Sequence, residues 1–157
     1  MYRVCFVCYG NICRSPMAEF IFKDLIYENK KRYKMSCTSR AISFEEIGND
    51  IYPDAKDVLD RHDVKIERHK ARRFSKEEYN DFDLIIVMEE RNKRDLLNII
   101  GDDLDNKVHK LREFVKDNKD IEDPWYTGRF DLVYKEIVEG CKGLFAYIES
   151  LGDIDEV

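Results

Sequence analysis

The strongest constraint on the fold is a short apolar run, RVCFVC (residues 3–8), followed at once by a Gly-Asn loop and a helix-starting proline. An apolar run without polar alternation is typical of a strand buried on both faces, as in a parallel sheet. Ser15 is the expected N-cap of the helix, and Pro16 then takes the first helical position. Residues 3–25 therefore predict a strand, a tight loop and a helix in direct succession.

Strand and helix patterns continue to alternate after this unit. The predicted strands cover residues 33–42, 83–89 and, more weakly, 106–114, and the predicted helices begin at Pro53, Ser75 and Arg91, with a last one over residues 130–151. This order predicts one α/β domain over residues 1–157, a three-layer, Rossmann-like fold whose four-stranded, twisted parallel sheet has helices on both faces. Ligands of such sheets bind beyond the carboxyl ends of the strands, where Cys8 and Glu89 are expected to lie.

The overall charge limits the classes of partner. The chain has 33 Asp and Glu residues against 27 Lys and Arg, a net charge of −6. Nucleic-acid binding needs a basic face that displaces counterions, so no nucleic acid is expected as a partner. No apolar stretch approaches the roughly 20 residues of a membrane span, and the start MYRVCFVCYG has no long apolar signal core. We therefore expect a cytoplasmic monomer without a membrane partner.

The cysteine pattern argues against a metal site. The chain has five cysteines, an odd number that indicates free thiols. Cys5 and Cys8 form a C-x-x-C pattern, but no second Cys/His pair at ligand spacing follows it, so we predict no metal. The period of a strand also places these two residues on opposite faces. Cys5, Cys37 and Cys141 are interpreted as core residues.

The loop between the first strand and the first helix, CYGNICRS (residues 8–15), has the character of an anion-binding cradle. Gly10 and Asn11 tolerate positive φ angles, and a loop that turns through such angles points successive backbone N–H groups inward. The following helix adds its unpaired N–H groups and the positive end of its dipole. We therefore expect a site for a phosphate-like oxyanion that needs no lysine.

Three side chains give this cradle a chemistry. Cys8 lies at its base, where a positive field favours the nucleophilic thiolate, although a cysteine at a strand end is by itself most often a packing residue. Arg14 carries a planar guanidinium that matches two phosphate oxygens at once. The Ser15 hydroxyl is expected to hydrogen-bond the Cys8 sulfur. Thiol, cradle and arginine together predict covalent phosphoryl transfer.

Two motifs in this order resemble the signatures of the low-molecular-weight protein tyrosine phosphatases: VCYGNICRSP at residues 7–16 and DPWYTG at residues 123–128. HKAR (residues 69–72) and FDLIIVM (residues 82–88) extend the likeness over nearly the whole chain. The resemblance implies a fold of the phosphotyrosine protein phosphatase I type and a hydrolase that acts on phosphotyrosine-containing proteins. It also implies that no metal or organic cofactor is needed and that phosphate-like oxyanions such as vanadate inhibit the enzyme.

The resemblance assigns roles to individual residues. It implies that Cys8 is the nucleophile, Arg14 the phosphate clamp and Asp123 the general acid and base, a proton transfer worth about 10²–10⁴-fold. The residues implied in phosphate or substrate binding are Tyr9, Gly10, Asn11, Ile12, Cys13, Ser15, Trp125 and Tyr126. Ser39 and His69 are implied, with Asn11 and Ser15, in a hydrogen-bond network that holds the loop.

Some of these residues have a second interpretation. Trp125 and Tyr126 are expected to flank the pocket mouth and stack on an aromatic substrate, but an aromatic pair that anchors a loop fits the sequence equally well. His69 would otherwise be a solvated histidine in the basic run of residues 68–73. Cys13 is near enough to trap an oxidised Cys8 as a disulfide, which would be a reversible protection.

The chain departs from the family pattern at two acidic positions. Glu45 stands where an aromatic wall residue is expected, with Phe44 one place before it, and Glu89 replaces a shorter aspartate.

Three other functions compete with phosphotyrosine hydrolysis. Protein arginine phosphatases have a threonine where this chain has Ile12. The apolar side chain of Ile12 suits a phenyl ring and favours phosphotyrosine. Arsenate reductases of this fold use extra cysteines after the third strand, but residues 82–100 contain none. A non-enzymatic phosphopeptide-binding module would lack the nucleophile or the acid.

Overall fold

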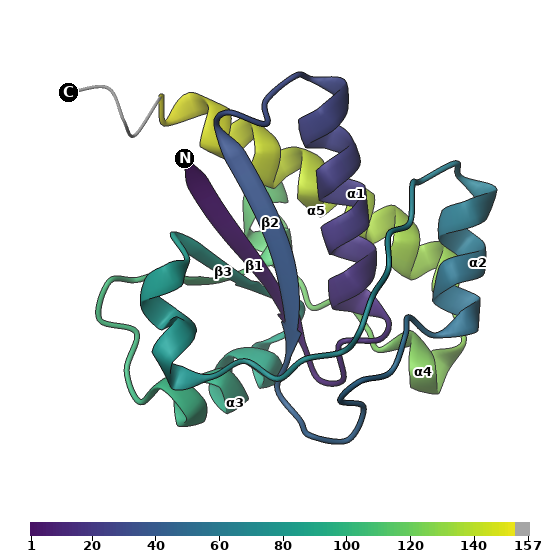
Figure 1. Ribbon diagram of the computed structural model, residues 1–157, viewed down its shortest axis with the longest axis horizontal. Helices are drawn as coiled ribbons and strands as arrows, with labels where there is room; N and C mark the ends of the chain where they lie inside the picture. Colours follow the sequence, from purple (N-terminus) through teal and green to yellow (C-terminus); the bar gives the residue numbers. More distant parts are fainter. Residues whose placement is uncertain (153–157) are drawn as a thin grey trace.

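The computed structural model describes residues 1–152 and has one four-stranded sheet in the order β2-β1-β3-β4 (Figure 1). The strands are β1 (Tyr2–Cys8), β2 (Met35–Ala41), β3 (Leu84–Val87) and β4 (Val108–Lys110). Every neighbouring pair is parallel, so the carboxyl ends of the strands lie at one edge, the lower edge in Figure 1. The predicted fold class is confirmed.

Helices cover both faces of this sheet. One face carries α1 (Arg14–Glu28), α2 (Pro53–Arg61) and α5 (Phe130–Ser150), and the other carries α3 (Glu90–Ile100) and the 3₁₀ helix η1 (Lys76–Asp81). Two short elements, η2 (Leu111–Val115) and α4 (Pro124–Thr127), lie between β4 and α5 in the chain. None of the helices within residues 1–152 has the length and apolar character that crossing a membrane requires.

β1 lies in the interior of the sheet and is buried on both sides from Val4 onward. Val4, Phe6 and Cys8 belong to the core on the α1 and α5 side, whereas Cys5 and Val7 belong to the core on the α3 side. Cys5 and Cys8 therefore lie on opposite faces, as the strand period predicts. Because burial contributes about 25 cal/mol per Å² of apolar surface, this packing fixes β1 and, with it, the position of Cys8.

The start of α1 differs from the prediction. The helix begins at Arg14 with Cys13 as its N-cap, so the prediction that Ser15 caps the helix was wrong. The Met17 N–H already donates to the Cys13 carbonyl at 3.0 Å, which places Ser15 in the first turn. Its hydroxyl lies 3.0 Å from the Cys8 sulfur instead. The functional site thus uses the side chain that the sequence pattern assigned to capping.

The last strand is also shorter than predicted. Instead of continuing to residue 114, the chain leaves β4 after three residues and turns into η2, which packs against α5. Gly143 of α5 makes this approach possible, because a Cβ atom there would overlap the carbonyl oxygen of Phe114. Tertiary packing therefore overrides the strand pattern of residues 106–114.

Gly143→Ala is expected to lower the free energy of unfolding by about 1–3 kcal/mol, because the added methyl group has to displace the backbone of η2. Lys142→Ala changes an exposed neighbour on the same helix and should alter stability by less than about 0.5 kcal/mol. Denaturant unfolding of the two variants measures the difference. Equal stabilities would show that η2 does not approach α5 this closely.

Candidate active site

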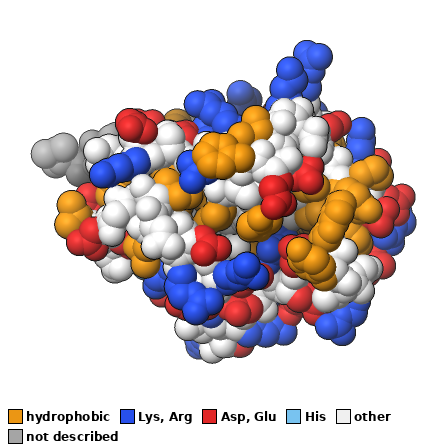
Figure 2. Space-filling view, turned by 90° about the horizontal axis from the view of Figure 1, so that it is seen from below, with side chains coloured by type: hydrophobic (Ala, Val, Ile, Leu, Met, Phe, Trp, Pro, Cys, Tyr) orange, Lys and Arg blue, Asp and Glu red, His pale blue; other side chains and the backbone are white. Residues whose placement is uncertain are grey.

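A pocket of about 110 Å³ opens where β1 ends. Its lining comes from the loop after β1, the loop after β2 and the region of α4, and consists of Cys8, Tyr9, Gly10, Ile12, Cys13, Arg14, Glu45, Glu46, Asp123, Trp125 and Tyr126. Figure 2 views the molecule from the side on which the strands end and shows hydrophobic side chains there, with both acidic and basic side chains among them. The structure thus brings the predicted Cys8, Arg14 and Asp123 together.

The loop after β1 owes its shape to Asn11. This residue is fully buried and adopts a left-handed backbone conformation with φ of 60°, which asparagine tolerates better than most residues. The expectation that Gly10 shares this conformation was wrong, because Gly10 has no positive φ. The turn therefore depends on one residue whose side chain also makes hydrogen bonds.

Cys8 ends β1 with its side chain only slightly exposed at the base of the pocket. Its sulfur accepts a hydrogen bond from the Ser15 N–H at 3.4 Å and lies 3.0 Å from Ser15 Oγ. The Asn11 Nδ2 group donates to this same hydroxyl at 2.7 Å. Because the hydroxyl oxygen accepts from Asn11, its hydrogen is free to point at the Cys8 sulfur.

The hydrogen bonds continue from Asn11 into α1. Asn11 Nδ2 also donates to Ser39 Oγ at 2.9 Å, and the Ser39 hydroxyl donates to Glu19 Oε1 at 2.6 Å. The other oxygen of Glu19 accepts from Lys23 Nζ at 2.6 Å. Sequence reasoning missed Glu19. Its position four residues after Ser15 and four before Lys23 puts all three on one helix face, a signal that was available.

His69 is buried beneath the loop, so the alternative of a solvated surface histidine is wrong. Its Nε2 lies 2.7 Å from the Asn11 carbonyl oxygen, a hydrogen bond in which the nitrogen donates. The Arg72 N–H donates to Asn11 Oδ1 at 3.1 Å. The structure thus places Ser15, Ser39 and His69 around Asn11 in one hydrogen-bonded cluster.

Arg14 is buried at the first position of α1 and is held by groups from two later segments. Its Nη1 donates to Glu89 Oε2 at 2.5 Å and to the Ile121 carbonyl at 2.8 Å, and its Nη2 lies 3.5 Å from Asp123 Oδ2. Burial would lower the pKa of Arg14, but the charges of Cys8, Glu89 and Asp123 raise it above its ordinary value. The longer carboxylate at Glu89 therefore orients the guanidinium.

Asp123 caps the short helix α4. Its Oδ1 accepts a hydrogen bond from the Trp125 N–H at 3.0 Å, and Pro124 follows it at the first helical position. The carboxylate keeps partial contact with solvent while its second oxygen faces Arg14. This geometry places the Asp123 carboxylate on the lining of the pocket.

The aromatic pair after Asp123 lies at the pocket, and Trp125 also packs against a neighbouring segment, whereas stacking on a substrate remains a prediction. Trp125 and Tyr126 line the pocket with exposed fractions of 52% and 81%. The Trp125 ring also meets the ring of Tyr52 at 4.9 Å between centroids, and Tyr52 stacks on Phe130 at 5.9 Å. The Tyr52 N–H donates to the Ile12 carbonyl at 2.8 Å. Tyr52 thereby joins α4 to the loop after β1, a link that local sequence could not reveal.

Cys13 and Glu45, one of the two departures from the family pattern, complete the pocket. Burial raises the pKa of the Cys13 thiol, which lines the pocket near Cys8, and a disulfide between the two remains a prediction. Glu45 lines the wall, whereas Phe44 is exposed and packs against the Arg73 guanidinium at 4.1 Å.

Within residues 1–152, no cluster of three or more His, Cys, Asp and Glu side chains has the arrangement of a metal site.

A hydrogen-bonded loop with a cysteine at its base, an arginine and an acidic cap define the class of site seen in cysteine-dependent phosphatases. The sequence model described as "Low molecular weight phosphotyrosine protein phosphatase" matches residues 3–153. The chain belongs to this family of hydrolases.

Individual relatives agree with this assignment. Low molecular weight protein-tyrosine-phosphatase YfkJ of Bacillus subtilis is 37% identical over 152 residues, which cover 96% of this chain and 97% of the relative. The crystal structure of YfkJ superposes with a TM-score of 0.94 at 36% identity and 98% coverage of both chains. The phosphatase SP-PTP of Streptococcus pyogenes gives a TM-score of 0.84 at 33% identity, covering 96% of this chain and 97% of its own.

Tyr52→Ala is expected to lower kcat/KM for an aryl phosphate by about tenfold, because α4 loses the aromatic contact that holds Asp123 and Trp125 at the pocket, and such contacts are worth about 0.5–1.5 kcal/mol each. Tyr52→Phe keeps the ring and should retain nearly full activity. Steady-state kinetics of both variants, with thermal unfolding to confirm folding, test this role. Equal activity of folded Ala and Phe variants would contradict it.

Proposed function

We propose that this protein dephosphorylates phosphotyrosine in proteins, with Cys8 as nucleophile, Arg14 as phosphate clamp and Asp123 as general acid and base. The observation that carries the proposal is that these three side chains line one small pocket, with the Cys8 sulfur at its base beside Ser15. Nucleophile, fixed cation and acid are the groups that phosphoryl transfer from an ester requires.

In the first step the Cys8 thiolate attacks phosphorus, an S–P bond forms and the ester O–P bond breaks. Asp123 gives its proton to the departing phenolate, which otherwise has a pKa of about 10 and is a poor leaving group. Arg14 and the backbone N–H groups of the loop stabilise the charge on the phosphoryl oxygens. The products of this step are a tyrosine side chain and a phosphocysteine.

In the second step water attacks the phosphocysteine, an O–P bond forms and the S–P bond breaks. The Asp123 carboxylate accepts the proton of the attacking water, and inorganic phosphate leaves. The Ser15 hydroxyl, 3.0 Å from the sulfur, stabilises the released Cys8 thiolate. These steps need no metal and no organic cofactor.

The walls of the pocket support an aromatic ester as substrate. Ile12 and Trp125 present apolar surface on the lining, which suits a phenyl ring above the bound phosphate. The cradle should also bind vanadate and other phosphate-like oxyanions, which would compete with substrate. Because one chain supplies every residue named for the site, we further propose that a monomer is sufficient. We also propose that the protein acts in the cytoplasm.

Asp123→Asn is expected to reduce kcat for a phosphotyrosine peptide by about 10²-fold or more, because the leaving phenolate loses its proton donor. The loss should be smaller for 4-nitrophenyl phosphate, whose leaving group is less basic. Cys8→Ser should abolish the turnover of both substrates. Stopped-flow and steady-state assays on the two variants, with unfolding curves as a check, measure these effects.

The same assays with phosphoarginine decide between this proposal and its alternatives. Faster turnover of phosphoarginine than of phosphotyrosine would identify a protein arginine phosphatase. Binding of a phosphotyrosine peptide without turnover would identify a binding module. Ester hydrolysis that persists in Cys8→Ser would contradict the covalent mechanism.

A further inference from the structure

We infer that this phosphatase selects phosphotyrosines that have a lysine or arginine beside them in the polypeptide. The inference rests on the proposed function and names the substrate class of the same site. It follows from an unusual distribution of charge around the pocket, which binds an anion at its base but carries carboxylates on its wall.

Glu45 and Glu46 both line the pocket, and neither forms an ion pair with a Lys, Arg or His side chain of residues 1–152. Phosphotyrosine brings a charge of about −2 toward these carboxylates. Negative charges on the wall of the pocket weaken the binding of the phosphorylated substrate unless a cation lies between or beside them. Among residues 1–152, Arg14 at the base is the only Lys or Arg side chain that lines this pocket, so a cationic side chain of the substrate would complete the wall.

The carboxylate of Glu45 is exposed and has a hydrogen-bond partner in the loop after β1. The Tyr9 hydroxyl, from the loop after β1, donates to Glu45 Oε1 at 2.7 Å. This hydrogen bond raises the pKa of Tyr9 above its ordinary value, so the phenol keeps its proton and donates it to the carboxylate. The second oxygen of Glu45 remains available to a substrate ammonium or guanidinium group.

Glu46 lies still closer to the cradle. A Cβ atom on Gly10 would be 3.4 Å from Glu46 Cγ, so the stem of this glutamate packs along the loop that is proposed to bind phosphate. Asn49 Nδ2 donates to Glu46 Oε2 at 2.6 Å and fixes the carboxylate. Two carboxylates on one wall give an arginine or a lysine of the substrate two anionic acceptors.

An adjoining cavity of about 210 Å³ extends this acidic character. It shares Tyr9, Arg14, Asp123 and Tyr126 with the pocket and adds Glu89, Arg91, Asn92 and Asp95. Glu89 is already paired with Arg14, and the highly exposed Arg91 only reaches Asp95 at 4.0 Å. Substrate residues next to the phosphotyrosine would therefore meet a further carboxylate, that of Asp95, whose ion pair with Arg91 spans 4.0 Å.

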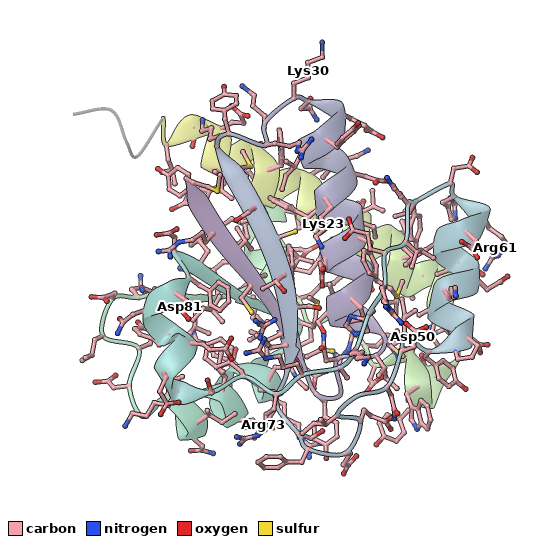
Figure 3. All side chains as sticks on the ribbon, in the orientation of Figure 1. Lys23, Lys30, Asp50, Arg61, Arg73 and Asp81 are labelled. Atoms are coloured by element: carbon pink, nitrogen blue, oxygen red, sulfur yellow. The ribbon has the colours of Figure 1, made fainter. Side chains whose placement is uncertain are left out.

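The basic residues of the neighbouring segment do not reverse this balance. Residues 68–73 contain four Lys and Arg residues, and none of them lines either cavity. Arg73 lies at the lower edge of the molecule in Figure 3, where its Nε donates to the Ile42 carbonyl and its guanidinium covers Phe44. An acidic flank would gain little from these cations and would face Glu45 and Glu46 directly.

Two phosphotyrosine peptides that differ only in lysine or glutamate at the positions flanking the phosphotyrosine test the inference. The lysine peptide is expected to have a kcat/KM about tenfold or more above that of the glutamate peptide. The ratio should shrink in 1 M salt, because the Debye length falls to about 3 Å. Equal kcat/KM values at low salt, or a preference for glutamate, would overturn the inference.

Variants at Glu45 and Glu46 test whether these two residues cause the preference for the lysine peptide. In the double variant Glu45→Gln, Glu46→Gln the ratio of the two kcat/KM values should fall toward one. Glu28→Gln removes an exposed charge at the far end of α1 and should leave the ratio unchanged. A ratio that survives in the double variant would overturn the assignment.

Phenyl phosphate, which has no flanking residues, distinguishes failure of the proposed function from failure of the inference. If the protein does not hydrolyse phenyl phosphate, the proposed function is contradicted. If it does, and the lysine and glutamate peptides have equal kcat/KM values, only the inference is contradicted.

Discussion

The structure of the site depends on the buried side chain and backbone of Asn11. A left-handed residue with no exposure is costly unless its surroundings hold it, and here four neighbours do so. The amide nitrogen donates to Ser15 and Ser39, the amide oxygen accepts from the Arg72 N–H, and the backbone carbonyl meets His69. The loop after β1 is therefore shaped before any ligand arrives, and the orientation of Ser15 toward the sulfur follows from the same contacts.

The second constraint is that a buried cation, Arg14, lies close to several carboxylates in one small pocket. Arg14 is buried between anionic groups, since Glu89 binds one of its nitrogens and Asp123 lies near the other. This arrangement provides a fixed cation at the base of the pocket without allowing it to move freely. Glu45 then gives the wall the opposite sign. The proposed binding of a phosphoryl group and the inferred choice among phosphotyrosine sequences thus depend on different residues of one pocket.

Much of the site was predictable from short-range sequence patterns. The apolar run of β1 and the Gly-Asn loop predicted that Cys8 ends a buried strand at the base of the loop. This was possible because the strand follows from local periodicity and the loop from one turn. The predicted hydrogen bond between Ser15 and Cys8 is present, and only the capping role of Ser15 was wrong, because a serine before a proline also satisfies the capping pattern. Tyr52 had no local signal at all. It meets Trp125 only because α2 and α4 are brought together by the fold.

The most direct test of this account measures how vanadate binding depends on Asn11, a residue that does not line the pocket. The single tryptophan of the chain, Trp125, is on the lining, so its fluorescence reports binding. Asn11→Ala is expected to weaken vanadate binding by about tenfold to a hundredfold, equivalent to about 1.4–2.8 kcal/mol. Asn106→Ala, at another left-handed but exposed asparagine, should not change it. Unchanged affinity in a folded Asn11→Ala protein would contradict the claim that this residue shapes the site.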